Sequence, residues 1–199
     1  MNSPARRTQE ERREATREAL LRASVVLIAS RGVDGASLQD VSERAGVTKG
    51  ALVHHFEHKD ALLDAVVDRC AAALRERVTA AWSPALAPWA RVRAALDAVF
   101  TLARDTEGEG RCLVELAVSA RTDPRLATKL GPRVGEVVRA FTRGLAQSLA
   151  EMGVVPRTPA ETLAEIVWTT ALGAALREEI AATQAVHALE VMLVAHFVP

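Results

Sequence analysis

The sequence predicts an all-α fold from three observations. Alanine, the strongest helix former, supplies 38 of the 199 residues, whereas tyrosine is absent and phenylalanine and tryptophan together number seven. Apolar residues recur every three to four positions over most of the chain. Glycine and proline stand between these stretches, where helices end. With 49% hydrophobic residues the chain has enough apolar material for a sizeable core.

The first four elements follow in order from local signals. Residues 1–10 carry a proline and an arginine pair without apolar spacing, which predicts a disordered arm. A helix is expected over 11–31, ended by Gly32. Ser37 is expected to cap a short helix over 38–44 in a near capping box with Asp40. Gly46 then supplies a tight turn, and Thr48 caps a third helix that ends near residue 56. Two short helices joined in this way form a helix-turn-helix pattern.

Helical periodicity continues to the end of the chain. We expect a long helix over 59–82, helices over 89–105 and 112–120, and a helix over 124–152 that Asp123 and Pro124 open and Pro132 kinks. A capping box over 158–161 is expected to open a helix to about 180, and a last helix covers about 184–197. The prediction is therefore nine helices, with an N-terminal head over 11–57 and a body over 58–199.

Composition also excludes several classes of protein. Lys+Arg and Asp+Glu both number 25, so net charge says nothing for or against an acidic partner such as DNA. Two cysteines without a CxxC pair argue against a disulfide framework or a structural zinc site. The longest apolar run near the start, 23–30, is too short to cross a bilayer and follows some twenty polar residues, unlike a signal peptide. We expect a cytoplasmic protein with no membrane contact.

The helix-turn-helix segment carries a specific resemblance. The pattern Val47-Thr-Lys-Gly-x-Leu-x-His-x-Phe56, followed by Lys59-Asp-x-Leu62, resembles the DNA-binding domain of the tetracycline-repressor (TetR) family. The run Ala120-Arg-x-Asp-Pro-x-Leu126 also resembles betaine- and choline-type regulators within that family. The resemblance implies a nine-helix architecture with a DNA-binding head and a body for ligand binding and dimerisation.

By this resemblance, nine positions are expected to contact double-stranded DNA: Gln39, Thr48, Lys49, Gly50, Ala51, Val53, His54, His55 and Lys59. Family members usually carry tyrosine at the positions of Val53 and His55. Here Val53 cannot form a hydrogen bond, and the charge of His55 depends on pH. Sequence preference is therefore expected to depend more on Lys49 and His54.

The body is expected to hold a small-molecule inducer and a homodimer interface. The inducer pocket that the resemblance implies falls on Leu96, Phe100, Cys112, Glu115, Leu116, Ser119, Val138, Phe141, Thr142, Trp168 and Leu172. Glu115 would favour a cationic ligand unless Arg104 or Arg111 pairs with it. The apolar faces of the last two helices predict a dimer interface of Leu163, Ile166, Val167, Thr170, Ala174, Val186, Leu189, Met192, Leu193 and His196.

The resulting prediction is a homodimeric repressor that a small-molecule inducer releases from a near-palindromic operator. An enzyme is disfavoured because the chain lacks a phosphate-binding glycine loop, GxSxG and HExxH. His54 and His58 are spaced for a shared metal, but no third ligand stands at a fitting spacing, so neither a metal nor a cofactor is expected. A helical interaction module that has lost specific DNA binding stays open, because Val53 and His55 depart from the family pattern.

Overall fold

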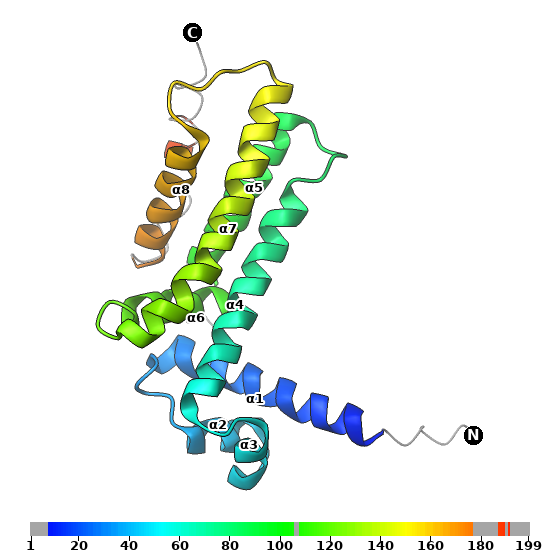
Figure 1. Ribbon diagram of the computed structural model, residues 1–199, viewed down its shortest axis with the longest axis vertical. Coiled ribbons are helices and arrows are strands. Elements are labelled where there is room, and N and C mark those ends of the chain that lie inside the picture. The colour runs from blue at the N-terminus through cyan, green and yellow to red at the C-terminus, as the bar shows by residue number, and fades with distance from the viewer. Residues whose placement is uncertain (1–7, 106–107, 177–186, 190, 192–199) are drawn as a thin grey trace, which may run out of the picture.

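The computed structural model describes residues 8–105, 108–176, 187–189 and 191, and side chains throughout these ranges except at 101–104. All regular structure in these ranges is helical, which confirms the predicted fold class. Figure 1 shows eight of the helices: α1 (Gln9–Arg31), α2 (Leu38–Ala45), α3 (Lys49–His55), α4 (Lys59–Ala81), α5 (Pro88–Arg104), α6 (Glu109–Ser119), α7 (Pro124–Glu151) and α8 (Ala160–Ala175). The last predicted helix falls largely outside the described residues, of which 187–189 and 191 are helical.

The three helices of the head begin and end where their capping residues require. Ser37 caps α2 in a full capping box with Asp40, as predicted. Gly46 ends α2 in the left-handed conformation at φ 69°, and the Thr48 hydroxyl caps α3 by accepting from the Ala51 amide. Helix α1 begins two residues earlier than expected, because Thr8 and Glu11 form a further capping box. These helices lie together at the lower end of the molecule in Figure 1.

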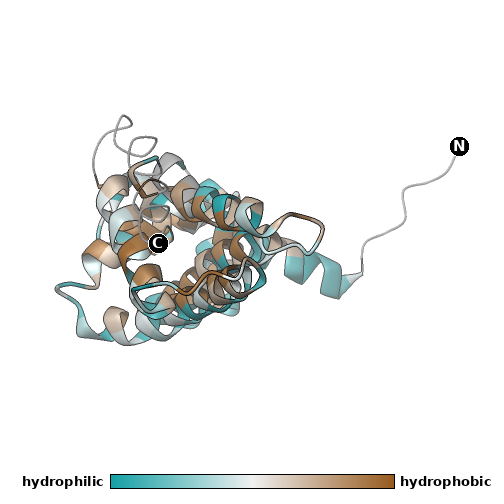
Figure 2. Cartoon of the chain, turned by 90° about the horizontal axis from the view of Figure 1, so that it is seen from above, coloured by the Kyte–Doolittle hydropathy of each residue, from teal (hydrophilic) through white to brown (hydrophobic). Residues whose placement is uncertain are grey.

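The body is a bundle built on α4, which starts beside α3 and runs to the opposite end of the molecule (Figure 1). Helices α5 and α7 pack along α4 and on each other, α8 packs against α5 and α7, and α6 crosses the end of the bundle and packs against α1. Seen from above in Figure 2, the apolar faces turn toward the middle of the bundle, whereas the N-terminal half of α1 extends outward and is hydrophilic. One continuous core includes residues of α1, α4, α5, α6, α7 and α8.

Charged side chains fasten α4 to its neighbours. Arg69 of α4 donates to Glu18 of α1 (2.7 Å, Nη1 to Oε1) and to Glu109 of α6 (3.0 Å, Nε to Oε1), so one guanidinium joins three helices. Lys129 of α7 pairs with Asp64 of α4 at 2.7 Å. Arg133 and Asp68 form a second pair one turn further along. The start of α4, which carries the head, is thereby fixed to both α6 and α7.

One local prediction needs correction. The capping box over 158–161 is wrong: Pro159 itself occupies the N-cap position at φ −53° and ψ 143°, it offers no side-chain acceptor, and α8 starts at Ala160. Helix α7 runs as one element from Pro124 to Glu151 with Pro132 inside it. No helix in the described part of the chain is long and apolar enough to cross a bilayer.

Candidate nucleic-acid interface

Helix α3 is held to the head by one side and leaves the other side free. Leu52 is fully buried, and Phe56 directly after the helix is 4% exposed. On the opposite side, Val53 is 46% exposed, and Lys49, Gly50 and His54 are exposed as well. Seven residues thus form a rigid, projecting helix whose outer side chains include a primary ammonium and an imidazole. Such a helix has the dimensions and chemistry for the major groove of DNA.

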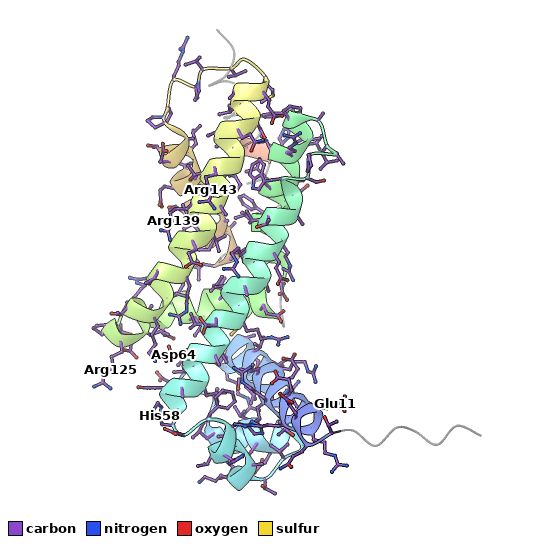
Figure 3. The ribbon with its side chains drawn as sticks, turned by 45° about the vertical axis from the view of Figure 1, so that its right-hand side comes forward. Glu11, His58, Asp64, Arg125, Arg139 and Arg143 are labelled. Atoms are coloured by element: carbon purple, nitrogen blue, oxygen red, sulfur yellow. The ribbon has the colours of Figure 1, made fainter. Side chains whose placement is uncertain are left out.

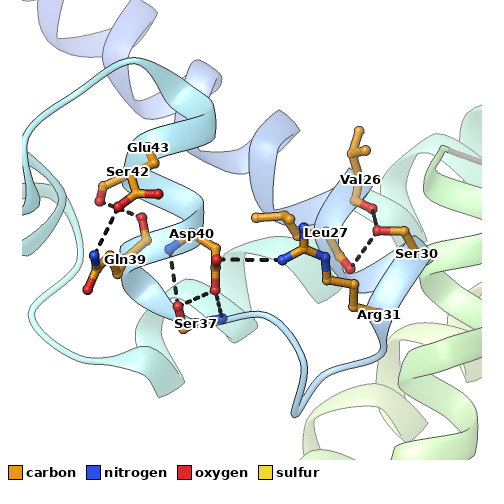
Figure 4. A network of polar contacts seen from close by, with 9 residues as sticks. All are labelled: Val26, Leu27, Ser30, Arg31, Ser37, Gln39, Asp40, Ser42 and Glu43. Atoms are coloured by element: carbon orange, nitrogen blue, oxygen red, sulfur yellow. Dashed lines mark hydrogen bonds and ion pairs between the residues drawn. The ribbon is translucent and has the colours of Figure 1, made fainter.

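Polar contacts fix α2 and join it to the end of α1, as Figure 4 shows. The Asp40 carboxylate accepts from the hydroxyl and the amide of Ser37, and these hydrogen bonds lower the pKa of Asp40. Arg31 at the end of α1 pairs with the same carboxylate at 3.5 Å. Gln39, one of the predicted DNA contacts, donates to Glu43 at 2.9 Å on the exposed side of α2. The start of α2 is therefore held to the end of α1 before any DNA binds.

Positive charge gathers where α1 meets the end of α3. The rings of His54 and His55 lie 5.8 Å apart, and the Arg17 guanidinium lies over the Phe56 ring at 5.7 Å from its centre. Burial lowers the pKa of His55, and the nearby positive charges of His54, Arg13 and Arg17 lower it further. Sequence reasoning missed Arg13 and Arg17, although their i,i+4 spacing on the polar side of the first helix was visible.

Two residues at the start of α4, His58 and Lys59, form contacts that stabilise the fold. His58, labelled at the foot of α4 in Figure 3, caps that helix because its Nδ1 accepts from the Ala61 amide at 3.0 Å. Lys59 is half-buried and donates from Nζ to the Val33 carbonyl at 3.2 Å, which ties the loop after α1 to α4. Among the described residues, no three His, Cys, Asp or Glu side chains come together as a metal site.

Comparison with known proteins agrees with this geometry. The family model "Bacterial regulatory proteins, tetR family" matches residues 20–66, from the middle of α1 to the first part of α4. An uncharacterized HTH-type transcriptional regulator of Mycobacterium tuberculosis is 37% identical over 132 residues. The head of this chain therefore matches the TetR family over residues 20–66. The aligned stretch covers 65% of this chain and 66% of the mycobacterial protein, just under two thirds of its length.

Two further matches extend the TetR relationship beyond the head. The HTH-type transcriptional regulator BetI of Paraburkholderia phymatum is 34% identical over 97 residues, which cover 46% of this chain and 47% of BetI. A crystal structure described as a TetR-family transcriptional regulator from Rhodococcus sp. superimposes with a TM-score of 0.79 at 22% identity, covering 92% of this chain and 99% of that one. The body therefore shares the TetR fold although its sequence has diverged.

A small apolar cavity of about 10 Å³ lies in the body between α5, α7 and α8. Three predicted pocket residues line it, and sequence reasoning missed the other four; the lining is Val99, Val137, Val138, Phe141, Ala164, Val167 and Trp168. The remaining predicted residues lie outside this lining: Leu96, Phe100, Cys112 and Leu116 are fully buried, and Glu115, Ser119, Thr142 and Leu172 are half-buried.

Glu115 has a partner within its own helix. Its Oε1 pairs with Nη2 of Arg111 at 2.6 Å, which is one of the two alternatives that the sequence left open. The hydroxyl of Thr142 likewise bonds within its helix, to the Val138 carbonyl at 2.9 Å. The charge that would have favoured a cationic ligand is therefore already neutralised.

The residues predicted for the dimer interface divide into two groups on the described part of the chain. Leu163, Val167, Ala174 and Leu189 are buried within the chain's own core. Ile166 and Thr170 are half-buried on the outer side of α8. Four others, Val186, Met192, Leu193 and His196, lie outside the described residues.

Proposed function

We propose that this chain is a homodimeric transcriptional repressor that binds a near-palindromic DNA operator through α3 and is released by a small-molecule inducer. The observation that carries the proposal is the presentation of α3. Leu52 and Phe56 anchor the helix while Lys49, Gly50 and His54 face outward at its start and along its exposed side.

The proposed contacts with DNA fall into two kinds. Lys49 and His54 are placed to reach base edges, and Gly50 lets the backbone come close to the duplex. Arg13 and Arg17, which lie beside His55, offer positive charge to a backbone phosphate, and a phosphate there would favour the charged form of His55, whose pKa is lowered in the free protein. Thr48, Ala51, Val53, Gln39 and Lys59 complete the proposed surface. Lys59 bonds one carbonyl and has further N–H groups to offer.

The proposed dimer interface is the outer side of α8. Ile166 and Thr170 lie next to exposed Gly173, where an added Cβ would meet nothing within 4 Å, and to Leu176, which is 56% exposed. Val191 further along the chain is also 56% exposed. A two-fold axis there would place two copies of α3 in successive major grooves, about 34–36 Å apart.

The inducer is proposed to enter between α5, α7 and α8. The cavity there is lined by aliphatic and aromatic side chains and carries no charged group, so an apolar, uncharged ligand fits its chemistry. At about 10 Å³ it must expand, and a ligand that prefers the expanded state shifts the population by its differential affinity.

Fluorescence anisotropy with the protein's own upstream DNA tests the proposal. Specific binding about 10³-fold tighter than to a scrambled duplex, with a steep dependence on salt, is expected. Equal and weak binding to every fragment in a genome-wide selection would refute it and favour the interaction module. Size-exclusion chromatography with light scattering should give the mass of two chains; a monomer at micromolar concentration would refute the dimer.

A further inference from the structure

The only two cysteines of the chain are buried together between α4 and α6. Cys70 is 1% exposed and Cys112 is 0% exposed. Arg69, the neighbour of Cys70, donates to Glu109, which lies one helical turn before Cys112. This register places both cysteines at the contact between α4 and α6. A hydrogen bond with Cys70, together with burial, raises the pKa of the Cys112 thiol.

The net charge of each chemical state decides which reactions this buried pair of thiols can undergo. A single buried thiolate is costly because a charge is removed from water without a counter-ion. A pair of thiols is neutral, and so is the disulfide that they form on oxidation. We propose that Cys70 and Cys112 are a redox pair that a small peroxide converts into an intramolecular disulfide.

The reaction balances with hydrogen peroxide as the oxidant. One thiol attacks a peroxide oxygen, the O–O bond breaks, and a sulfenic acid and a water molecule form. The second thiol attacks the sulfenic sulfur, the S–S bond forms, and the hydroxyl leaves as a second water. The two thiol protons end in water, both sulfurs are oxidised, and the peroxide is reduced. Because the thiolate is the nucleophile, the reaction is slow at neutral pH and becomes faster as pH rises.

The position of the pair links this chemistry to the head. Arg69, directly beside Cys70, also binds Glu18 of α1, so α1, α4 and α6 meet at this point. A disulfide brings its two sulfurs to about 2.05 Å and therefore draws α4 and α6 together. Since α4 begins next to α3, we expect the oxidised dimer to lose its match to the groove spacing and to bind DNA more weakly. Disulfide formation does not depend on the proposed function. Only the expected effect of the disulfide on DNA binding rests on the proposed function.

Thiol counting and mass spectrometry of the full chain test the chemical step. After excess hydrogen peroxide, unfolded protein should show no free thiol instead of two, the intact mass should fall by two hydrogens, and digestion should yield one linked peptide that contains both cysteines. Dithiothreitol should restore both thiols. Two surviving thiols, a sulfinic acid on either residue, or a link between two chains would each overturn the proposal.

Operator binding by reduced and oxidised protein tests the consequence. We expect the Kd to rise at least fivefold on oxidation and to return with dithiothreitol. An unchanged Kd would overturn the link between this pair and the head. A protein that binds no DNA in either state would refute the proposed function. The thiol counts and masses would still test disulfide formation independently.

Variants with one cysteine provide the matched controls. Cys70→Ser and Cys112→Ser each keep one thiol and all three methionines, so peroxide should leave their DNA affinity unchanged. Cys112→Ala serves the same purpose without placing a hydroxyl in an apolar site, in case the serine variants fold poorly. If Cys112→Ala loses affinity after peroxide as wild type does, the oxidation lies elsewhere, and the proposal fails.

Discussion

Replacing Gly50 with alanine separates the stability of α3 from its contact with DNA. An ideal Cβ at Gly50 would meet only the Thr48 hydroxyl, at 3.9 Å, so the free protein has room for the methyl group. Alanine favours a helix over glycine by about 0.5–1 kcal/mol. At about 2–4 °C per kcal/mol for a chain of this size, we expect the Tm to rise by about 1–4 °C.

The same methyl group stands on the side of α3 that the proposed function brings against DNA. A loss of about 1 kcal/mol at each head costs a dimer about 2 kcal/mol, which corresponds to a roughly 30-fold higher Kd. Calorimetry measures the first effect, and anisotropy with the operator measures the second. We expect the Gly50→Ala protein to be more stable than wild type and to bind the operator more weakly.

Gly46→Ala is the matched control in the same head. Gly46 also has open space around it, but its φ of 69° strains any residue with a Cβ, so this variant should be less stable by about 1–2 kcal/mol. A Gly50→Ala protein that binds the operator as tightly as wild type would refute the close approach of α3 to DNA. A lowered Tm would refute the open space described at this position.

Three further predictions concern charge, packing and pH. Lys49→Ala should cost about 1–3 kcal/mol of operator affinity at each head and relax the preference for the operator over a scrambled duplex, measured by anisotropy; an unchanged preference would place Lys49 away from the base edges. Gly144→Ala should cost about 1–3 kcal/mol in thermal unfolding, because its Cβ would lie 2.2 Å from the Trp82 ring, whereas Gly135→Ala in the same helix, whose Cβ would meet only the flexible end of Arg139, should not destabilise the chain. A phosphate beside His55 favours the charged imidazole, so binding takes up a proton; DNA affinity should therefore increase as the pH falls from about 7.5 through 6.5 toward the lowered pKa of the free protein, and His55→Gln should remove much of this trend.

Local signals predicted the head well because capping is a matter of neighbouring residues. Ser37, Gly46 and Thr48 act within three or four positions, and each lies in the structure where its chemistry requires it. The exposed side of α3 likewise follows from the burial of Leu52 alone, since the helix has only seven residues. Composition and the helical spacing of apolar residues were sufficient to predict the all-α fold class.

Contacts between distant segments could not be predicted in this way. Arg69 and Glu18 are 51 positions apart, and nothing in the periodicity of either helix pairs them. The cavity was predicted only in part, because an apolar residue that faces a void looks in the sequence like one that faces a neighbour. Gly144 was a missed signal: a glycine inside a helix indicates close approach, and here the Trp82 ring occupies the space of its absent side chain.

The head and the body of the chain share one hydrophobic core, and this limits how the DNA specificity of the protein can evolve. Leu20, Val25 and Ile28 of α1 belong to the same core as the bundle, and α1 packs on α6 of the body. A fragment cut after residue 57 would lose the packing of α1 on α6 and α4, so the head is not a self-contained unit. Exchange of heads between relatives by recombination would break the α1–α6 packing. New operator preferences are therefore expected to arise by point substitution on the outer side of α3, where Lys49, Val53 and His54 have few packing constraints.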